Sequence, residues 1–152
     1  MPAYNVILAG TDGSRSSLRA VDAAGQLAAA TDARLVLACA YHPMPERARL
    51  AAAEELGDEA YKVAGSTPAD DALRDGRDRA KAVGVQDVET VPRAGDAVDV
   101  LIELIRERDV DLLVVGNRGL NSLAGRLLGS VPANLSHRAP CDVLIVHTTS
   151  GR

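Results

Sequence analysis

Residues 111–136 read DLLVVGNRGLNSLAGRLLGSVPANLS, a strand, a glycine-rich loop and a helix in immediate succession. The run Asp111–Gly116 is short, apolar and rich in valine, which is typical of a buried strand. A helix is expected over Ser130–Arg138, with Ser130 as a natural N-cap and a proline in the first turn. A strand that leads through a loop into a helix is the repeating unit of a parallel α/β sheet.

The rest of the chain continues this alternation of short apolar runs and longer helical patterns. The further expected helices run from Ser14 to about Ala30, from Thr67 to Gly84, and from the capping residue Asp96 to Ile105. The further expected strands are Tyr4–Gly10, Arg34–Ala40, Val85–Val91 and Asp142–His147. Their apolar runs are unbroken, which suits a sheet covered on both faces. The sequence therefore predicts a doubly wound, five-stranded parallel α/β sheet of the Rossmann-like type, in the strand order 3-2-1-4-5.

We interpret residues 1–152 as a single domain, because this length suffices to bury roughly two-thirds of the unfolded chain's surface. Residues 41–66 interrupt the alternation of strands and helices. Their part Glu46–Tyr61 is rich in Ala, Glu and Arg and is expected to form a helical excursion within the domain.

The composition excludes several classes of protein. Hydrophobic residues make up 47% and charged residues 25% of the chain, the balance of a globular protein. The formal net charge of -4 disfavours nucleic acid as a partner, because neutralisation of phosphates dominates that affinity. Without Trp or Phe there is little aromatic surface on which bases could stack. A small anion is still compatible with the chain, since a few backbone amides can bind phosphate.

The sequence also bears on compartment and cysteine chemistry. Its start lacks the features of a signal peptide, and no uncharged apolar run approaches the ~20 residues that span a bilayer. We therefore expect a cytoplasmic protein without a membrane partner. Cys39 and Cys141 form no C-x-x-C pair and have no histidine cluster at zinc spacing. Cys39 lies in an apolar run, and we interpret it as a buried packing residue.

Ligands of such a sheet bind beyond the carboxyl ends of the strands, where the strand order reverses. Three segments are expected to meet there: Gly10–Ser14, Ala40–His42 and Gly116–Gly119. The carboxylate of Asp12 can accept two hydroxyl hydrogen bonds from a ribose. It can equally form an Asx turn that caps the first helix, and the two roles are compatible.

The segment that starts at Gly116 has the most specific pattern. Two residues separate Gly116 from Gly119, and nine separate Gly119 from Gly129. Glycines let backbone amides approach an anion, and the next helix adds the positive end of its dipole. Arg118 and Arg126 would add charge at the rim. The pattern predicts a phosphate cradle; the alternative is that glycine and serine only mark a turn before a helix.

At these residues the chain resembles the universal stress protein family. The glycine spacing, completed by Ser130, meets in full the Gly-x2-Gly-x9-Gly-Ser/Thr pattern of the family's ATP-binding members. The segment Gly10–Ser14 is similar to the family's opening segment, and Pro140–Val146 is similar to its last strand. The resemblance covers essentially the whole chain.

The resemblance implies a fold of the adenine nucleotide alpha hydrolase type that binds ATP, accompanied by Mg²⁺, or cyclic AMP. It implies that Asp12, beside Thr11, reaches the ribose and that the backbone of Ala40 lies at the adenine. The nucleotide-binding residues predicted from the motifs and the resemblance together are Gly10, Thr11, Asp12, Ala40, Val115, Gly116, Asn117, Arg118, Gly119, Arg126, Gly129, Ser130 and Val131.

Beyond the ligand, the resemblance implies a regulatory or stress-survival role and a homodimer formed through the last strand. The residues give a separate reason for the dimer. Val143–His147 is expected to be an apolar edge strand without Pro or Lys, and such an edge should be covered.

No catalytic or metal-ligating residue is predicted. The chain lacks the Gly-x4-Gly-Lys-Ser/Thr, Gly-x-Ser-x-Gly and His-Glu-x-x-His motifs. His42 falls nearest to the predicted crevice, yet no base is placed to activate water. We favour nucleotide binding without efficient turnover; the alternative is a slow ATP hydrolase or an adenylate-forming enzyme on the same fold.

Overall fold

The computed structural model of the chain describes residues 3–43, 67–118 and 129–148, so the predicted excursion Glu46–Tyr61 lies outside it. The strands are β1 (Val6–Gly10), β2 (Arg34–Tyr41), β3 (Val88–Ala94), β4 (Leu112–Gly116) and β5 (Asp142–Val146). They form one parallel sheet in the order β3-β2-β1-β4-β5. The predicted fold class and strand order are confirmed.

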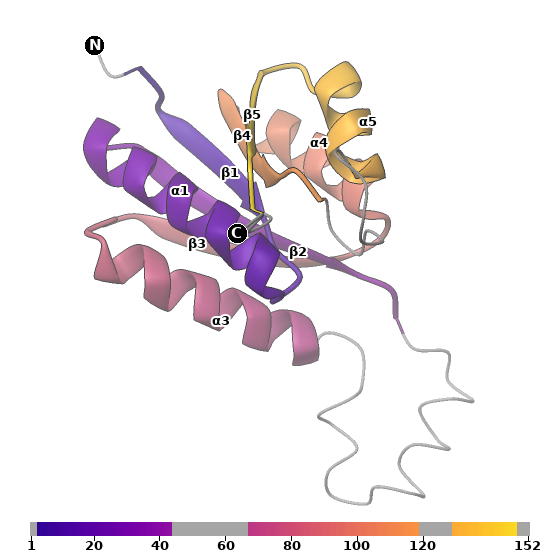
Figure 1. The fold of residues 1–152 in the computed structure, drawn as a ribbon, viewed down its shortest axis with the longest axis horizontal. Coiled ribbons are helices and arrows are strands. Elements are labelled where there is room, and N and C mark those ends of the chain that lie inside the picture. Colours follow the sequence, from indigo (N-terminus) through magenta and orange to yellow (C-terminus); the bar gives the residue numbers. More distant parts are fainter. Residues whose placement is uncertain (1–2, 44–66, 119–128, 149–152) are drawn as a thin grey trace, which may run out of the picture.

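Helices cover both faces of this sheet (Figure 1). They are α1 (Arg15–Thr31), α3 (Thr67–Ala82), α4 (Ala97–Glu107) and α5 (Ser130–Arg138). Successive strand residues point to opposite faces, so Ile7 packs in the cluster with α1 and α3 while Leu8 packs in the cluster with α4 and α5. Both clusters are built from aliphatic side chains. Within the described ranges, no helix is long and apolar enough to cross a membrane.

The third strand differs from its prediction by three residues at each end. It was expected over Val85–Val91 and instead spans Val88–Ala94, running through Pro92. Val85 belongs to the turn after α3, where its amide donates to the carbonyl of Ala80 at 3.1 Å. Proline lacks the N–H of an interior strand residue, but β3 is an edge strand and, among the described strands, pairs with β2 alone. The edge position is therefore why the strand continues past the proline.

An ionic cluster fastens this edge strand to its neighbours. The carboxylate of Glu89 in β3 accepts a hydrogen bond from Arg34 of β2 at 2.6 Å. It also accepts hydrogen bonds from Nε and Nη2 of Arg108, the residue that ends α4. The hydrogen bonds from Arg108 lower the pKa of the Glu89 carboxyl below its ordinary value. These paired charges hold β2, β3 and the end of α4 together.

Cys39 is a packing residue, as its apolar neighbours predicted. Its side chain is buried in β2, on the face covered by α1 and α3. Burial raises the pKa of the Cys39 thiol to about 11, so the thiol stays protonated at neutral pH. Cys141, which precedes β5, is half-buried, and burial raises the pKa of its thiol as well. Neither cysteine is in a disulfide.

Candidate functional site

The carboxyl ends of β1, β2 and β4 lie at one edge of the sheet, as the strand order requires. β1 pairs with β2 on one side and with β4 on the other. The amide of Thr11, just after β1, donates to the carbonyl of Ala38 at 2.9 Å. Gly10 and Val115 are buried, and Ala40 is half-buried near the end of β2. The strand order reverses between β1 and β4, so the described parts of the three predicted segments are brought to the expected place.

The loop after β1 is held by its own polar groups. Oδ1 of Asp12 accepts a hydrogen bond from the amide of Ser14 at 2.9 Å, which is an Asx turn, and Gly13 between them has φ +82°. Oγ of Ser14 then accepts from the amide of Ser17 and caps α1. The Asx turn predicted as one role of Asp12 is present, but the residue that caps the first helix is Ser14 and not Asp12. Its carboxylate is only half-buried, so a ligand at this edge can still reach it.

A pair of buried hydroxyl groups also supports this loop. The hydroxyls of Thr11 and Ser17 are hydrogen-bonded at 2.9 Å, and both side chains are buried. Thr11 Oγ1 also accepts from the amide of Gly13 at 3.0 Å, and Ser17 Oγ accepts from the amide of Asp12. Sequence reasoning missed Ser17, because a serine in the first turn of a helix gives no sign of its partners. These bonds fix the position of Asp12.

Asn117, the first residue after β4, makes backbone hydrogen bonds to β5 and to the residue that precedes α5. The amide of Asn117 donates to the carbonyl of Val146 in β5 at 2.8 Å, and its own carbonyl accepts from the amide of Gly129 at 2.7 Å. Asn117 is buried, whereas Arg118 is half-buried. Gly119 and Arg126 lie outside the described residues. Asn117 therefore joins the start of the glycine-rich loop to its end.

The first turn of α5 is capped by Gly129 and not by Ser130 as predicted. Gly129 has φ -69° and ψ 167°, no side-chain hydrogen bond caps this helix, and the first intrahelical bond runs from Ala133 to Gly129. Ser130 is instead the first helical residue, because the bond between Gly129 and Asn117 fixes where the helix begins. The first amides of a helix have no intrahelical acceptor. In α5 the amides of Ser130 and Val131 belong to this first turn, at the positive end of the helix dipole, which attracts an anion.

Packing against Thr148 gives a reason for a glycine at position 116 that the sequence did not reveal. A Cβ at this position would lie 3.0 Å from Cγ2 and 3.4 Å from Oγ1 of Thr148. A contact of 3.0 Å is tighter than nine in ten real Cβ contacts, so the buried side chain of Thr148 would have to move by a few tenths of an ångström. The motif glycine thus makes room for a threonine after β5, whether or not a ligand approaches it.

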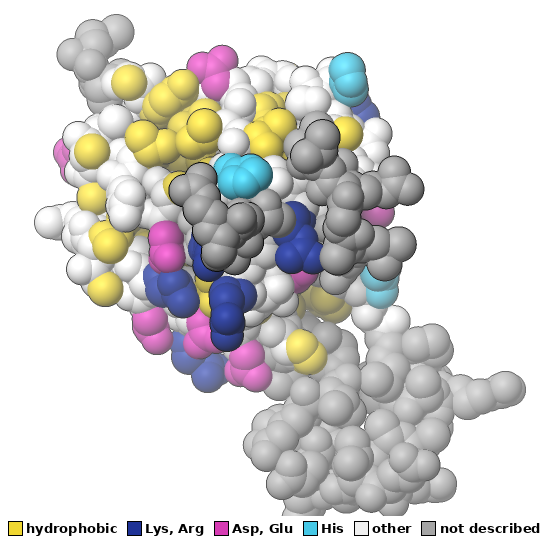
Figure 2. Space-filling view, viewed as in Figure 1, with side chains coloured by type: hydrophobic (Ala, Val, Ile, Leu, Met, Phe, Trp, Pro, Cys, Tyr) yellow, Lys and Arg dark blue, Asp and Glu magenta, His cyan; other side chains and the backbone are white. Residues whose placement is uncertain are grey.

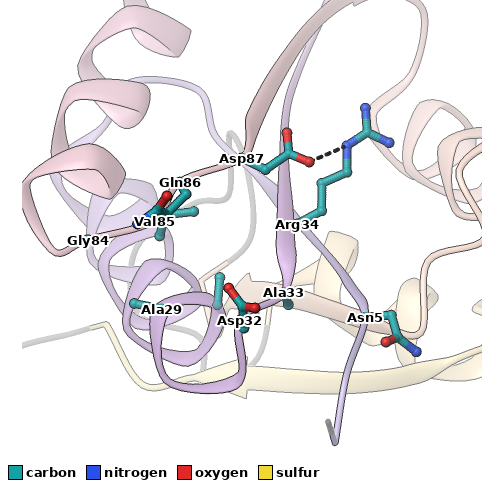
Figure 3. A pocket seen from close by; sticks show the side chains of 10 residues that line it. Asn5, Ala29, Asp32, Ala33, Arg34, Gly84, Val85, Gln86 and Asp87 are labelled. Atoms are coloured by element: carbon teal, nitrogen blue, oxygen red, sulfur yellow. Dashed lines mark ion pairs between the residues drawn. The ribbon is translucent and has the colours of Figure 1, made fainter.

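A hollow of about 230 Å³ lies at the opposite, amino-terminal edge of the sheet (Figure 3). Asn5, Asp32, Arg34 and Asp87 are among the residues that line it. Arg34 forms two ion pairs there: its Nε lies 3.7 Å from Oδ2 of Asp87, and its Nη2 lies 2.6 Å from Oε1 of Glu89. This hollow is not where a doubly wound sheet binds its ligands, so we place the candidate site at the carboxyl edge.

Within the described part of the chain, no group of three or more His, Cys, Asp or Glu side chains could hold a metal ion. His42 follows Tyr41 at the end of β2 and is exposed, as are His137 and His147.

A sequence model of the universal stress protein family matches residues 3–147. The chain belongs to this family. Universal stress protein Rv1636 of Mycobacterium tuberculosis H37Rv is 56% identical over 149 residues, which are 98% of this chain and 100% of that protein. A putative universal stress protein of Staphylococcus aureus USA300 is 30% identical and is aligned over 97% of this chain and 87% of its own length.

Solved structures of universal stress proteins have the same fold. One in complex with cAMP is 50% identical to this family member, covers 97% of this chain and 99% of its own, and superposes with a TM-score of 0.75. The universal stress protein from Archaeoglobus fulgidus in complex with dAMP is 17% identical, with a TM-score of 0.66 and coverage of 96% and 99%. At that identity the second likeness bears on the fold alone.

Proposed function

We propose that this universal stress protein binds an adenine nucleotide at the carboxyl edge of its sheet. The observation that carries the proposal is the start of α5. Gly129 caps it without a side chain, and its amide is tied to Asn117, which leaves the next amides of the helix pointing out of its first turn. An anion at a helix N-terminus gains both hydrogen bonds and the field of the dipole. The half-identical neighbour in complex with cAMP supports the same chemistry.

In this proposal the ligand lies across the point where the strand order reverses. Asp12, placed by its Asx turn, accepts hydrogen bonds from the ribose hydroxyls, with Gly10 and Thr11 beside it. The backbone of Ala40 lies at the adenine. The phosphate groups are held by Val115, Gly116, Asn117, Arg118, Gly119, Arg126, Gly129, Ser130 and Val131.

We propose cyclic AMP or ATP as the ligand and a regulatory, stress-related role in place of rapid turnover. Mg²⁺ would accompany ATP, held by the phosphates with Asp12 as the nearest carboxylate of the loop. A carboxylate and phosphate oxygens are the ligands that Mg²⁺ prefers. The backbone and side chains of this chain would bind and orient the nucleotide.

Titration calorimetry of the folded protein with cyclic AMP, ATP and ADP tests the proposal. We expect at least one of them to bind, and we expect Asp12→Ala to weaken it about 10–100-fold, because hydrogen bonds to a charged group are lost. Asp12→Asn is the matched control, since its amide oxygen can keep the turn to Ser14. It should lose less affinity than Asp12→Ala.

No heat with any of the three nucleotides would contradict the proposal. Release of ADP over several turnovers, lost in Asp12→Ala, would instead favour the slow ATP hydrolase considered above. The two outcomes are separated by analysing the nucleotide after the titration.

We propose further that two copies pair through β5. This strand is the last of the sheet, pairs with β4 alone among the described strands, and exposes Leu144 at 38%. Leu144 and Val143 line a hollow with Tyr4, Leu27 and Leu112. Figure 2 shows hydrophobic side chains gathered over the upper part of the view, whereas charged side chains gather lower down, toward α3. An apolar edge strand is stabilised when a second strand covers it.

Sedimentation velocity at micromolar concentration tests the pairing. The unchanged chain is expected to sediment as a dimer, and Leu144→Lys is expected to shift it to the monomer, because a lysine on an edge strand opposes pairing. A monomer in both samples would contradict the proposed dimer.

A further inference from the structure

The buried polar side chains of the described residues gather at one place. They are Thr11, Ser17, Asn117 and Thr148, each 5% exposed or less, and all lie at the carboxyl edge of the sheet. None of the described buried side-chain nitrogens or oxygens lacks a hydrogen-bond partner. Burying polar groups is costly unless they are paired, so a cluster of them marks a place where geometry is fixed.

Thr148, the residue two places after β5, is bound to Asn117 by two hydrogen bonds. Its amide donates to Oδ1 of Asn117 at 2.7 Å, and its hydroxyl donates to the same oxygen at 3.0 Å. The backbone carbonyl of Asn117 accepts from Gly129, the cap of α5. Asn117 thus connects Thr148 to the start of that helix.

The first turns of α1 bind Thr148 from the other side. Oγ of Ser16 is hydrogen-bonded to Oγ1 of Thr148, and Nη1 of Arg19 donates to its carbonyl at 2.7 Å. An amide oxygen can only accept, so the Thr148 hydroxyl donates to Asn117 and the Ser16 hydroxyl donates to Thr148. The end of the described chain lies beside α1 in Figure 1. Ser17, next to Ser16, supports the loop of Asp12.

We propose that Thr148, held by Ser16 and Arg19, is a positioning residue for the phosphate of the bound nucleotide. Through Asn117 it sets where Gly129 and the first amides of α5 stand relative to Asp12. The segment after β5 therefore takes part in recognition without touching the ligand. The inference rests on the proposed nucleotide site. It makes Thr148, a residue outside the glycine motif, responsible for the alignment of the phosphate-binding amides.

Thr148→Val tests this assignment, because valine keeps the shape of threonine and removes only the hydroxyl. We expect affinity for cyclic AMP to fall about tenfold, because the two hydrogen bonds that the hydroxyl makes with Asn117 and Ser16 are lost and the anion site is misaligned. Affinity for adenosine, which has no phosphate, should stay unchanged. Thr148→Ser restores the hydroxyl and should restore the affinity.

The matched control is Thr31→Val at the far end of α1, where the hydroxyl donates to the carbonyl of Leu27 at 2.7 Å. It should change neither affinity. An unchanged affinity for cyclic AMP in Thr148→Val, or an equal loss for adenosine, would overturn the inference.

Hydrogen exchange separates this inference from the proposed function, since it needs no ligand. In Thr148→Val the amide of Gly129, which is bonded to Asn117, should exchange faster, whereas amides in β2 should not change. If the unchanged chain bound no nucleotide, the proposed function would fail. Unaltered exchange at Gly129 would overturn the positioning role itself.

Discussion

Replacing Gly129 by glutamate is expected to weaken binding of ATP or cyclic AMP by at least about 100-fold. The new carboxylate would sit at the start of α5, where we place the phosphate. Two negative charges about 4 Å apart repel each other by about 4 kcal/mol at the effective dielectric constant of a protein surface, and access of water lowers this figure. The affinity lost in Gly129→Glu should therefore approach the affinity that the phosphate group of the ligand contributes.

The backbone conformation at this position suits a side chain. Gly129 has φ -69°, a value that every residue can adopt, so the substitution adds no backbone strain. A negative charge also interacts favourably with a helix N-terminus. Because Gly129 is buried, the thermal midpoint of each variant is measured by circular dichroism, and affinities are compared only between variants that keep the midpoint of the unchanged chain.

Gly129→Gln is the control that separates charge from size, since glutamine has the same length and is neutral. Calorimetry should find Gly129→Gln between the unchanged chain and Gly129→Glu. Equal affinities for Gly129→Glu and the unchanged chain would mean that the phosphate does not lie at α5.

Leu113→Ala is expected to lower the free energy of unfolding by about 3 kcal/mol. Leu113 is fully buried in β4, in the cluster covered by α4 and α5. Truncation removes apolar contacts and leaves a cavity between sheet and helices that the rigid surroundings fill only in part.

Leu144→Ala in the adjacent strand is the matched control. Leu144 is 38% exposed and pairs in register with Val114, the residue after Leu113. Chemical denaturation at a protein concentration below that of self-association should give a cost under about 1 kcal/mol. Similar costs for the two leucines would contradict the burial that distinguishes them.

Most of the fold could be predicted because its signals are local. Unbroken apolar runs mark the interior strands, and the helix cap Asp96 stands where it is predicted. The limits of β3 could not be predicted, because they depend on its place at the edge of the sheet. A proline argues against an interior strand, because it has no N–H to donate to a neighbouring strand. Only the strand order shows that β3 has a neighbouring strand on one side and none among the described strands on the other.

The candidate site was predicted less completely for a related reason. The glycine spacing and Asp12 are visible in the sequence, and the described ones lie at the expected edge. The partners that hold them are distant along the chain: Asn117 and Thr148 are 31 residues apart, and Ser16 and Thr148 are 132 apart. The cap of α5 was assigned to Ser130 from its residue type, whereas a backbone bond from Gly129 to Asn117 decides it.

A side chain at position 116 would crowd Thr148, so we expect the residues at these two positions to vary together among homologues. A methyl group added at Gly116 would meet first Cγ2 of Thr148, the one atom that serine lacks. Homologues with alanine at the first position should therefore carry a smaller residue at the second, and serine would preserve the hydroxyl. The residue at position 148 would therefore limit which residues can replace Gly116 at the start of the glycine-rich loop.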